Sequence, residues 1–120
     1  MKQKRVGDWG EAVAASYLRE RGYEILAAGY RTRYGEIDLI AADAAFLIFV
    51  EVKTRKDADF ALAREAVDAR KRAKIRRTAE MFLIENETEL QPRFDVIELY
   101  APRGEQTARP EILHMEDAFQ

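Results

Sequence analysis

The chain has 120 residues, of which 48% are apolar and 35% charged, with a formal net charge of −2. This size suits one core, so we expect a single nuclease-like domain over residues 1–120. The absence of cysteine excludes disulfides, thiolate zinc sites and cysteine nucleophiles. No stretch is long and apolar enough for export or membrane insertion, which predicts a cytoplasmic protein with no membrane partner.

The first predicted element is an amphipathic helix from about Lys4 to Arg21. Apolar and small residues recur in it at spacings of three and four, and Gly22 is placed to end it. Glu11 falls at the margin of the apolar arc and not in the middle of the polar side. This position makes Glu11 a candidate functional carboxylate.

Three strands are predicted after this helix. A short strand runs from Tyr23 to Ala27 and is followed by a turn at Ala28-Gly29. Two further strand-like runs, Arg31 to Ala41 and Ala45 to Thr54, are separated by only a few residues. This short separation predicts an antiparallel hairpin.

The hairpin brings two carboxylates and a lysine toward each other. Glu51 and Lys53 share one face of their strand because alternate residues point the same way. A turn centred between Ala44 and Ala45 puts Asp38 directly opposite Glu51. A turn one residue earlier makes the two carboxylates diagonal neighbours, still within roughly 7–8 Å. Either register lets one metal ion bridge them.

The rest of the chain predicts one long helix and two strands. The helix runs from about Asp59 to Glu85, and the strands run from Arg93 to Tyr100 and from Glu111 to Met115. The predicted order is therefore α-β-β-β-α-β-β. With the long helix crossing over to a parallel strand, the predicted fold class is α/β with a mixed sheet.

The converging side chains suit phosphodiester hydrolysis. Mg²⁺ or Mn²⁺ prefers oxygen ligands, which Asp38 and Glu51 supply, with the backbone carbonyl of Val52 as a further ligand. Lys53 would stabilise developing negative charge, and we expect the adjacent carboxylates to hold it protonated. The structural alternative is a cross-strand salt bridge, but these strands are otherwise apolar, and charges are rarely buried without a partner or a task.

The segments GEIDLI (residues 35–40) and FVEVKTR (residues 49–55) resemble the core of the YraN-like bacterial family of predicted endonucleases. That family lies within the PD-(D/E)XK superfamily and is similar to archaeal Holliday-junction resolvases. The resemblance covers nearly the whole chain and implies a restriction-endonuclease-like fold. It also implies that Asp38, Glu51 and Lys53 occupy the metal-binding and catalytic positions, with Glu11 joining or supporting the site. A DNA substrate is implied, including branched DNA, and a homodimer is left open.

The long predicted helix carries six basic residues within eight positions. They are Arg70, Lys71, Arg72, Lys74, Arg76 and Arg77. A helix spreads such a cluster around its circumference, so part of it is an ordinary solvated face. In an acidic protein, this local excess favours contact with nucleic-acid phosphates. The candidates for that contact are Arg70, Lys71, Lys74 and Arg77, with Arg31 and Arg55 near the hairpin.

Other polar residues are interpreted as structural. His114, the only histidine, is expected to be structural, and Asp95 is expected to pair with Arg93 or another basic residue. For Glu36, assisting the metal and pairing with a nearby arginine both stay open. The sequence thus favours a metal-dependent endonuclease. The alternatives are a non-catalytic nucleic-acid-binding module and an adaptor that keeps the nuclease fold.

Overall fold

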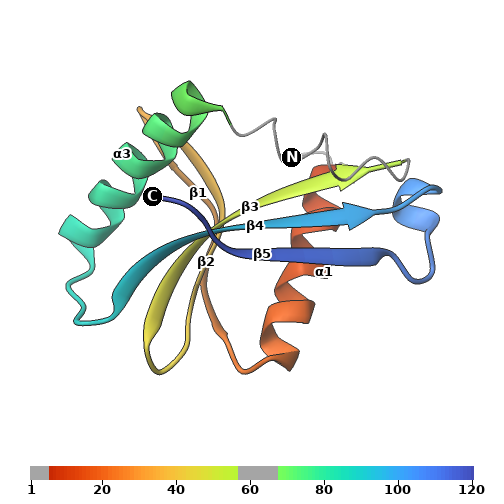
Figure 1. The fold of residues 1–120 in the computed structure, drawn as a ribbon, viewed down its shortest axis with the longest axis horizontal. Helices are drawn as coiled ribbons and strands as arrows, with labels where there is room; N and C mark the ends of the chain where they lie inside the picture. The colour runs from red at the N-terminus through yellow and green to blue at the C-terminus, as the bar shows by residue number, and fades with distance from the viewer. Residues whose placement is uncertain (1–5, 57–67) are drawn as a thin grey trace, which may run out of the picture.

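The centre of the protein is one twisted sheet, seen in a computed structural model that describes residues 6–56 and 68–120 (Figure 1). The elements are α1 (Val6–Glu20), β1 (Glu24–Thr32), β2 (Gly35–Ala42), β3 (Phe46–Arg55), α3 (Ala69–Glu85), β4 (Gln91–Tyr100), η2 (Gly104–Gln106) and β5 (Glu111–Phe119). Within this part of the chain, five strands lie in the order β1-β2-β3-β4-β5. β3 and β4 are parallel, and the other neighbours are antiparallel. The predicted order and the mixed α/β sheet are confirmed.

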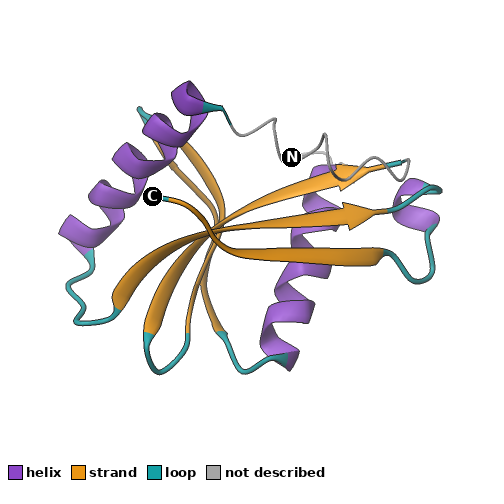
Figure 2. Cartoon of the chain, in the orientation of Figure 1, coloured by secondary structure: helices purple, strands orange, loops and turns teal. Residues whose placement is uncertain are grey.

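The two helices cover opposite faces of this sheet (Figure 2). On one face, Leu18 of α1 packs into a buried cluster with Val50 and Ile97. On the other, Phe82 of α3 packs against Phe49. β3 is therefore apolar on both faces along most of its length, as a central strand should be. A charged residue on β3 must be held within one of these two layers.

The end of α1 matches the prediction. Gly22 has a φ of +91°, which a glycine adopts without steric cost. The N–H of Tyr23 donates to the carbonyl oxygen of Leu18, and that of Gly22 donates to Arg19, both at 3.0 Å. These paired bonds are a Schellman cap, which satisfies the last carbonyls of the helix. Residues 4 and 5 of the predicted helix lie outside the described residues.

The predicted turn at Ala28-Gly29 is wrong. β1 continues to Thr32, and the connection to β2 consists of Arg33-Tyr34, so β2 begins at Gly35 rather than at Arg31. Gly29 adopts a φ of +67° within the strand, so its backbone irregularity is accommodated without ending the pairing. In the sequence Gly29 suggests a turn, but in the structure it lies at a local backbone irregularity within β1, which is an edge strand.

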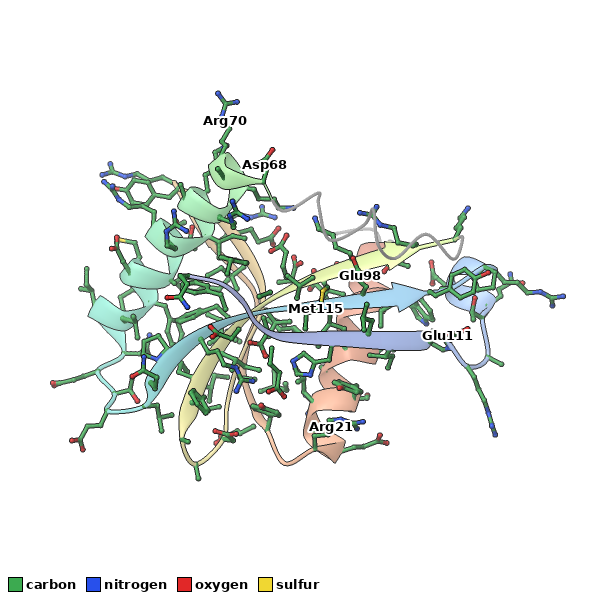
Figure 3. All side chains as sticks on the ribbon, viewed as in Figure 1. Arg21, Asp68, Arg70, Glu98, Glu111 and Met115 are labelled. Atoms are coloured by element: carbon green, nitrogen blue, oxygen red, sulfur yellow. The ribbon has the colours of Figure 1, made fainter. Side chains whose placement is uncertain are left out.

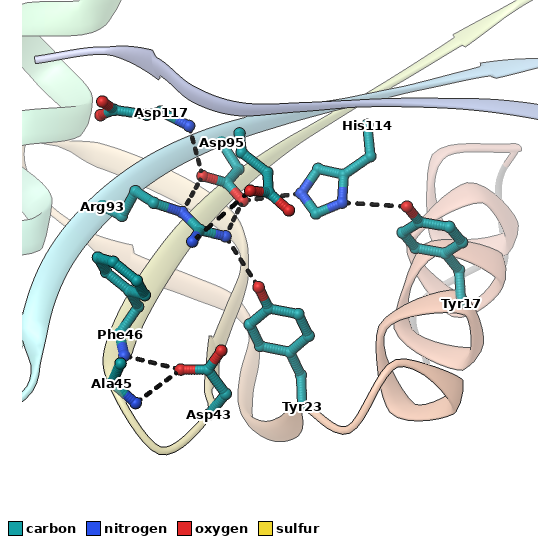
Figure 4. Close-up of polar contacts among 10 residues, drawn as sticks. Tyr17, Tyr23, Asp43, Ala45, Phe46, Arg93, Asp95, His114 and Asp117 are labelled. Atoms are coloured by element: carbon teal, nitrogen blue, oxygen red, sulfur yellow. Dashed lines mark hydrogen bonds and ion pairs between the residues drawn. The ribbon is translucent and has the colours of Figure 1, made fainter.

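The connection between β2 and β3 is as predicted. Leu39 pairs with Val50, which is the register of a turn centred between residues 44 and 45. The side chain of Asp43 accepts hydrogen bonds from the backbone N–H groups of Ala45 at 2.9 Å and Phe46 at 2.7 Å, which closes the turn (Figure 4). Of the two registers considered, the first is confirmed.

The second half of the chain differs from prediction at its boundaries. Asp68 caps α3 by accepting from the N–H of Lys71 at 2.9 Å, and residues 59–67 of the predicted helix lie outside the described residues. β5 extends past Met115 to Phe119, across a register shift in its pairing with β4. An irregular backbone at Asp117, with a φ of +53°, accompanies this extension.

Candidate metal centre

The carboxylates of Asp38 and Glu51 face one another where β2 and β3 separate. Continuing the register of Leu39 and Val50 by one step places them opposite each other. The ladder does not continue there, and Asp38 Oδ2 instead accepts a hydrogen bond from the backbone N–H of Val52 at 2.8 Å. It is thus the amide of Val52, rather than its carbonyl, that contacts Asp38.

Two lysines converge on Glu51. Lys71 Nζ lies 2.9 Å and Lys53 Nζ 3.6 Å from the same oxygen, Glu51 Oε1. The other oxygen, Oε2, is buried and has no hydrogen-bond partner among the residues that the structure describes. The Glu51 residue as a whole is only 6% exposed. One oxygen of this carboxylate is therefore paired with two lysines, and the other is buried and unsatisfied within the described residues.

Lys71 comes to this site from α3. It was predicted to contact nucleic-acid phosphates from the surface, yet its ammonium pairs with Glu51 on β3. A signal for this was available in the sequence, because Lys71 precedes Ile75 by four residues and Ala79 by eight. Residues at those spacings share one helix face, and both Ile75 and Ala79 are buried.

Glu11 approaches from α1. Helix and sheet lie close together here, because a Cβ added at Gly10 would clash with the hydroxyl of Thr54 on β3. Glu11 is half-buried, and its negative charge contributes to raising the pKa of Asp38. The structure therefore brings Glu11 within electrostatic range of Asp38. Glu11 comes from α1, whereas Lys71 comes from α3.

The surroundings of the site disfavour the charged forms of Asp38 and Lys53. Burial and the charge of Glu51 raise the pKa of Asp38 to about 7, although the hydrogen bond from Val52 opposes this. Burial, together with the neighbouring Lys71, lowers the pKa of Lys53. Glu51 and Asp38 act to raise the pKa of Lys53, as expected, but the net shift is downward, and the protonation of Lys53 stays a prediction. Desolvation outweighs the attraction of the two acids.

The donor set fits a hard divalent cation. Among residues 6–56 and 68–120, no three Asp, Glu or His side chains form a complete cage for a metal ion. Magnesium does not need one, because it keeps several waters and is commonly held by one or two carboxylates. Asp38 and Glu51 Oε2 supply that number of carboxylates. A zinc site with thiolate ligands is excluded, because the chain has no cysteine.

A third buried carboxylate near the site was missed. Glu98 is fully buried on β4, and the parallel register places it beside Lys53 on the same face of the sheet. The signal was its place in the otherwise apolar run from Val96 to Tyr100, where a charged residue is as unusual as Glu51 is in β3.

A separate acidic cluster lies on β4 and β5 (Figure 4). Asp95 is fully buried and accepts two hydrogen bonds from the Arg93 guanidinium, at 2.9 and 2.8 Å. It is also 2.7 Å from His114 Nε2 and accepts from the N–H of Asp117 at 3.0 Å. Although burial acts to raise the pKa of Asp95, these partners lower it overall. The interpretation of His114 as structural, and the pairing of Asp95 with Arg93, agree with these contacts.

The basic candidates near the hairpin are dispersed. Arg31 is exposed and pairs with Glu36 at 3.3 Å, so of the two readings for Glu36 the arginine pair is the one seen. Arg55 is partly buried at the end of β3. Arg31 is thus paired on the surface, away from the acidic pair.

The basic residues of α3 separate into different directions. Arg70 projects away from the sheet at the N-terminal end of the helix (Figure 3). Lys74 and Arg77 are exposed and face the turn between β1 and β2. Arg76 lies on another side of the helix, where it donates to the backbone carbonyl of Gln120. With Lys71 at Glu51, the cluster is divided between the acidic site and the surface.

The fold and this site define a small α/β protein with a buried acidic pair flanked by lysines. Neither described α-helix combines the length and apolar composition that a transmembrane span needs. The sequence pattern of the uncharacterised protein family UPF0102 matches residues 10–99, which include all the residues placed at the site.

Relatives cover the chain from end to end. A UPF0102 protein of Caldanaerobacter subterraneus subsp. tengcongensis is 42% identical over 120 residues, covering 99% of this chain and 98% of its own. One from Nocardia farcinica is 44% identical over 118 residues, covering 98% and 91%. The chain belongs to the UPF0102 family.

Proposed function

We propose that this protein is a Mg²⁺- or Mn²⁺-dependent endonuclease that hydrolyses phosphodiester bonds in DNA. The observation that carries the proposal is the half-satisfied acidic pair. Asp38 and Glu51 face each other, and Glu51 Oε2 is buried without a hydrogen-bond partner in the described chain. An arrangement of this kind is costly unless a ligand completes it, and perturbed, buried carboxylates favour a functional site.

Each residue of the acidic site has a proposed role. Asp38 and Glu51 would hold the ion, the carbonyl of Val52 is a further candidate ligand, and Glu11 adds negative charge nearby. When bound, the ion supplies charge neutralisation at the phosphate and a more acidic water. Lys53 Nζ would stabilise negative charge on the phosphate oxygens.

The substrate follows from the surface charge. The protein has a net charge of −2, so attraction to a polyanion depends on local groups such as Lys74 and Arg77. Contacts of this type bind the phosphate backbone without reading bases, which suits an enzyme that selects the shape of DNA. Branched or flapped DNA is the substrate class we propose. Dimerisation stays a prediction, to be measured by light scattering.

The decisive test compares cleavage by the wild type, Asp38→Asn and Glu36→Gln. Single-stranded, duplex, flapped and four-way DNA are incubated with Mg²⁺ or Mn²⁺. Glu36 lies on the same strand two residues away but is exposed and paired with Arg31, so Glu36→Gln is the matched control. We expect cleavage by the wild type and the control, and a loss of at least about a hundredfold in Asp38→Asn. Equal cleavage by all three proteins would reject the site.

A non-catalytic nucleic-acid-binding module is the second candidate. The observation that favours it is the pairing of Lys71 and Lys53 with Glu51, which partly balances the acidic charge without a metal ion. Calorimetry separates the two functions. DNA binding without any Mg²⁺ or Mn²⁺ binding would support the module. An adaptor is distinguished by keeping its protein partners in pull-downs with Asp38→Asn.

A further inference from the structure

An aromatic pocket with positively charged walls lies between the β1–β2 turn and α3. Its volume is about 440 Å³, and it is lined by Arg33, Tyr34, Ala73, Lys74 and Arg77. None of these five residues belongs to the acidic site described above. No acidic side chain lines the pocket, so the charges at its wall are those of two arginines and a lysine.

The phenol ring of Tyr34 is fixed by its surroundings. Arg33 Nη2 donates to the Tyr34 hydroxyl at 2.9 Å, and the backbone N–H of Tyr34 donates to Thr32 Oγ1 at 3.0 Å. The guanidinium carbons of Arg33 and Arg77 lie 5.0 and 4.8 Å from the ring centroid, which is within cation–π range. The Tyr34 ring and the guanidinium groups of Arg33 and Arg77 are therefore already in position before any ligand binds.

The wall contributed by α3 is also held in position. A Cβ added at Gly35 would lie 3.5 Å from Thr78 Oγ1 and 3.7 Å from Lys74 Cβ, so strand and helix are in close contact here. Thr78 is fully buried, and its hydroxyl donates to the carbonyl oxygen of Lys74 at 2.8 Å. The turn and the helix are thus packed against each other beside the pocket.

The same helix connects the pocket to the acidic pair. Lys71, which contacts Glu51, is three residues before Lys74 and six before Arg77. At about 1.5 Å per residue, the two ends of this stretch are separated by roughly 9 Å along the axis. A short stretch of DNA strand spans such a distance, so one strand can reach both places.

We propose that this pocket is a nucleotide subsite that holds an unpaired base of the DNA strand being cut, next to the phosphate that a metal ion held by Asp38 and Glu51 would contact. The base stacks on Tyr34, and Arg33, Lys74 and Arg77 neutralise the adjoining phosphates. A base within a duplex is stacked on both sides and has no free face to offer. The subsite therefore selects single-stranded or flapped DNA, an inference that rests on the proposed nuclease function.

Binding without divalent metal tests the subsite independently of cleavage. Fluorescence anisotropy in EDTA compares a single-stranded oligonucleotide with a blunt duplex of the same sequence, using the wild type, Tyr34→Leu, Tyr34→Phe and Lys74→Gln. We expect Tyr34→Leu to bind the single strand about five- to a hundredfold more weakly, with an unchanged salt dependence. Tyr34→Phe keeps the ring and should stay within about twofold of the wild type. Lys74→Gln should reduce the salt slope by about 0.7.

Three results would overturn the subsite. The first is single-strand binding by Tyr34→Leu as tight as that of the wild type. The second is an equal loss in Tyr34→Phe and Tyr34→Leu, which would assign the effect to the hydroxyl and its arginine. The third is a loss of affinity in Tyr34→Leu that is equal for the duplex and the single strand. Absence of binding of either DNA by the wild type counts as the same result.

A second measurement needs no variant. The fluorescence of 2-aminopurine in the single strand should be quenched by stacking when the wild-type protein binds, and an unquenched complex would also overturn the subsite. Tight, Tyr34-dependent binding by a protein that cleaves nothing would uphold the subsite and reject the nuclease. Cleavage that is unaffected by Tyr34→Leu would uphold the nuclease and reject the subsite.

Discussion

The sheet carries two buried acidic centres that differ in how completely their carboxylates are bonded. Asp95 is reached by a guanidinium, an imidazole and a backbone N–H, so both of its oxygens are occupied. At the other centre, both lysines approach Glu51 Oε1, and Oε2 has no hydrogen-bond partner in the described chain. The pKa of Asp95 is lowered, whereas that of Asp38 is raised to about 7.

How completely a carboxylate is bonded distinguishes a structural site from a functional one better than its burial does. Asp95 is the more deeply buried of the two acids, yet nothing in its surroundings is left for a ligand. The site of Asp38 and Glu51 is instead unfavourable in the metal-free protein, and a divalent cation would relieve its repulsion. We therefore expect the two centres to respond to substitution with opposite signs.

The largest effect is expected for Asp95→Asn. Neutralising this carboxylate leaves the buried Arg93 guanidinium, which is 9% exposed, with only the exposed Glu116 at 4.0 Å as a counter-charge. We expect a loss of about 3–5 kcal/mol in the free energy of unfolding, measured by urea denaturation. Glu36→Gln removes an exposed ion pair with Arg31 and should cost at most about 1 kcal/mol. Similar losses in both variants would contradict the structural role of Asp95.

Asp38→Asn should stabilise the metal-free protein. Between pH 3.8 and about 7 the folded state binds the proton of Asp38 more tightly than the unfolded chain, so the wild type loses stability as pH rises through this window. Asparagine is not subject to this loss and can still accept the hydrogen bond from Val52. We expect a gain of about 1–3 kcal/mol at pH 8 in EDTA.

The pH dependence of that gain is its internal control. The difference between Asp38→Asn and the wild type should shrink as the pH falls and vanish below 3.8, where the wild-type carboxyl is protonated in both states. Chemical denaturation in EDTA across this range measures the difference. A loss of stability in Asp38→Asn at pH 8 would show that its charge is compensated, and the contrast with Asp95 would disappear.

How much of these centres the sequence predicts depends on whether their contacts are local. Alternation and a short turn are sufficient to place Asp38 opposite or diagonal to Glu51, because hairpin register is determined by nearby residues, and the structure selects the first of these registers. The pairing of Lys71 with Glu51 joins residues on different elements and depends on how α3 crosses the sheet. Helical spacing predicts only that Lys71 lies on the buried face.

The remaining misses have similar causes. Gly29 locally favours a turn, but β1 continues through it because the strand is paired with β2 on both sides of this residue. Strand pairing thus overrides the local preference of the glycine. The centre at Asp95 is assembled from β4, β5 and α1, with Tyr17 on α1 contributing through His114. Only the bond between Arg93 and Asp95, two residues apart on one strand, was accessible from the sequence.

Lys71→Met should tighten metal binding. Lys71 Nζ lies 2.9 Å from Glu51 Oε1, so its charge opposes the approach of a second cation to the same carboxylate. We expect the affinity for Mn²⁺, measured by calorimetry, to rise about tenfold, which corresponds to about 1.4 kcal/mol. Arg72→Met, which changes the next residue of α3, should leave the affinity unchanged. Weaker binding in Lys71→Met would instead mean that the lysine organises Glu51 for the metal.

The smallest effect is expected at the periphery of the Asp95 centre, in Tyr17→Phe. A carboxylate only accepts hydrogen bonds, so His114 Nε2 donates to Asp95, and in the neutral imidazole Nδ1 accepts from the Tyr17 hydroxyl at 3.1 Å. Phenylalanine keeps the edge-to-face packing on His114 and loses only this bond, at a cost of about 0.5–1.5 kcal/mol in urea denaturation. A loss as large as that of Asp95→Asn would mean that the bonds of this centre are cooperative and that its stability depends on the position of His114 rather than on the ion pair.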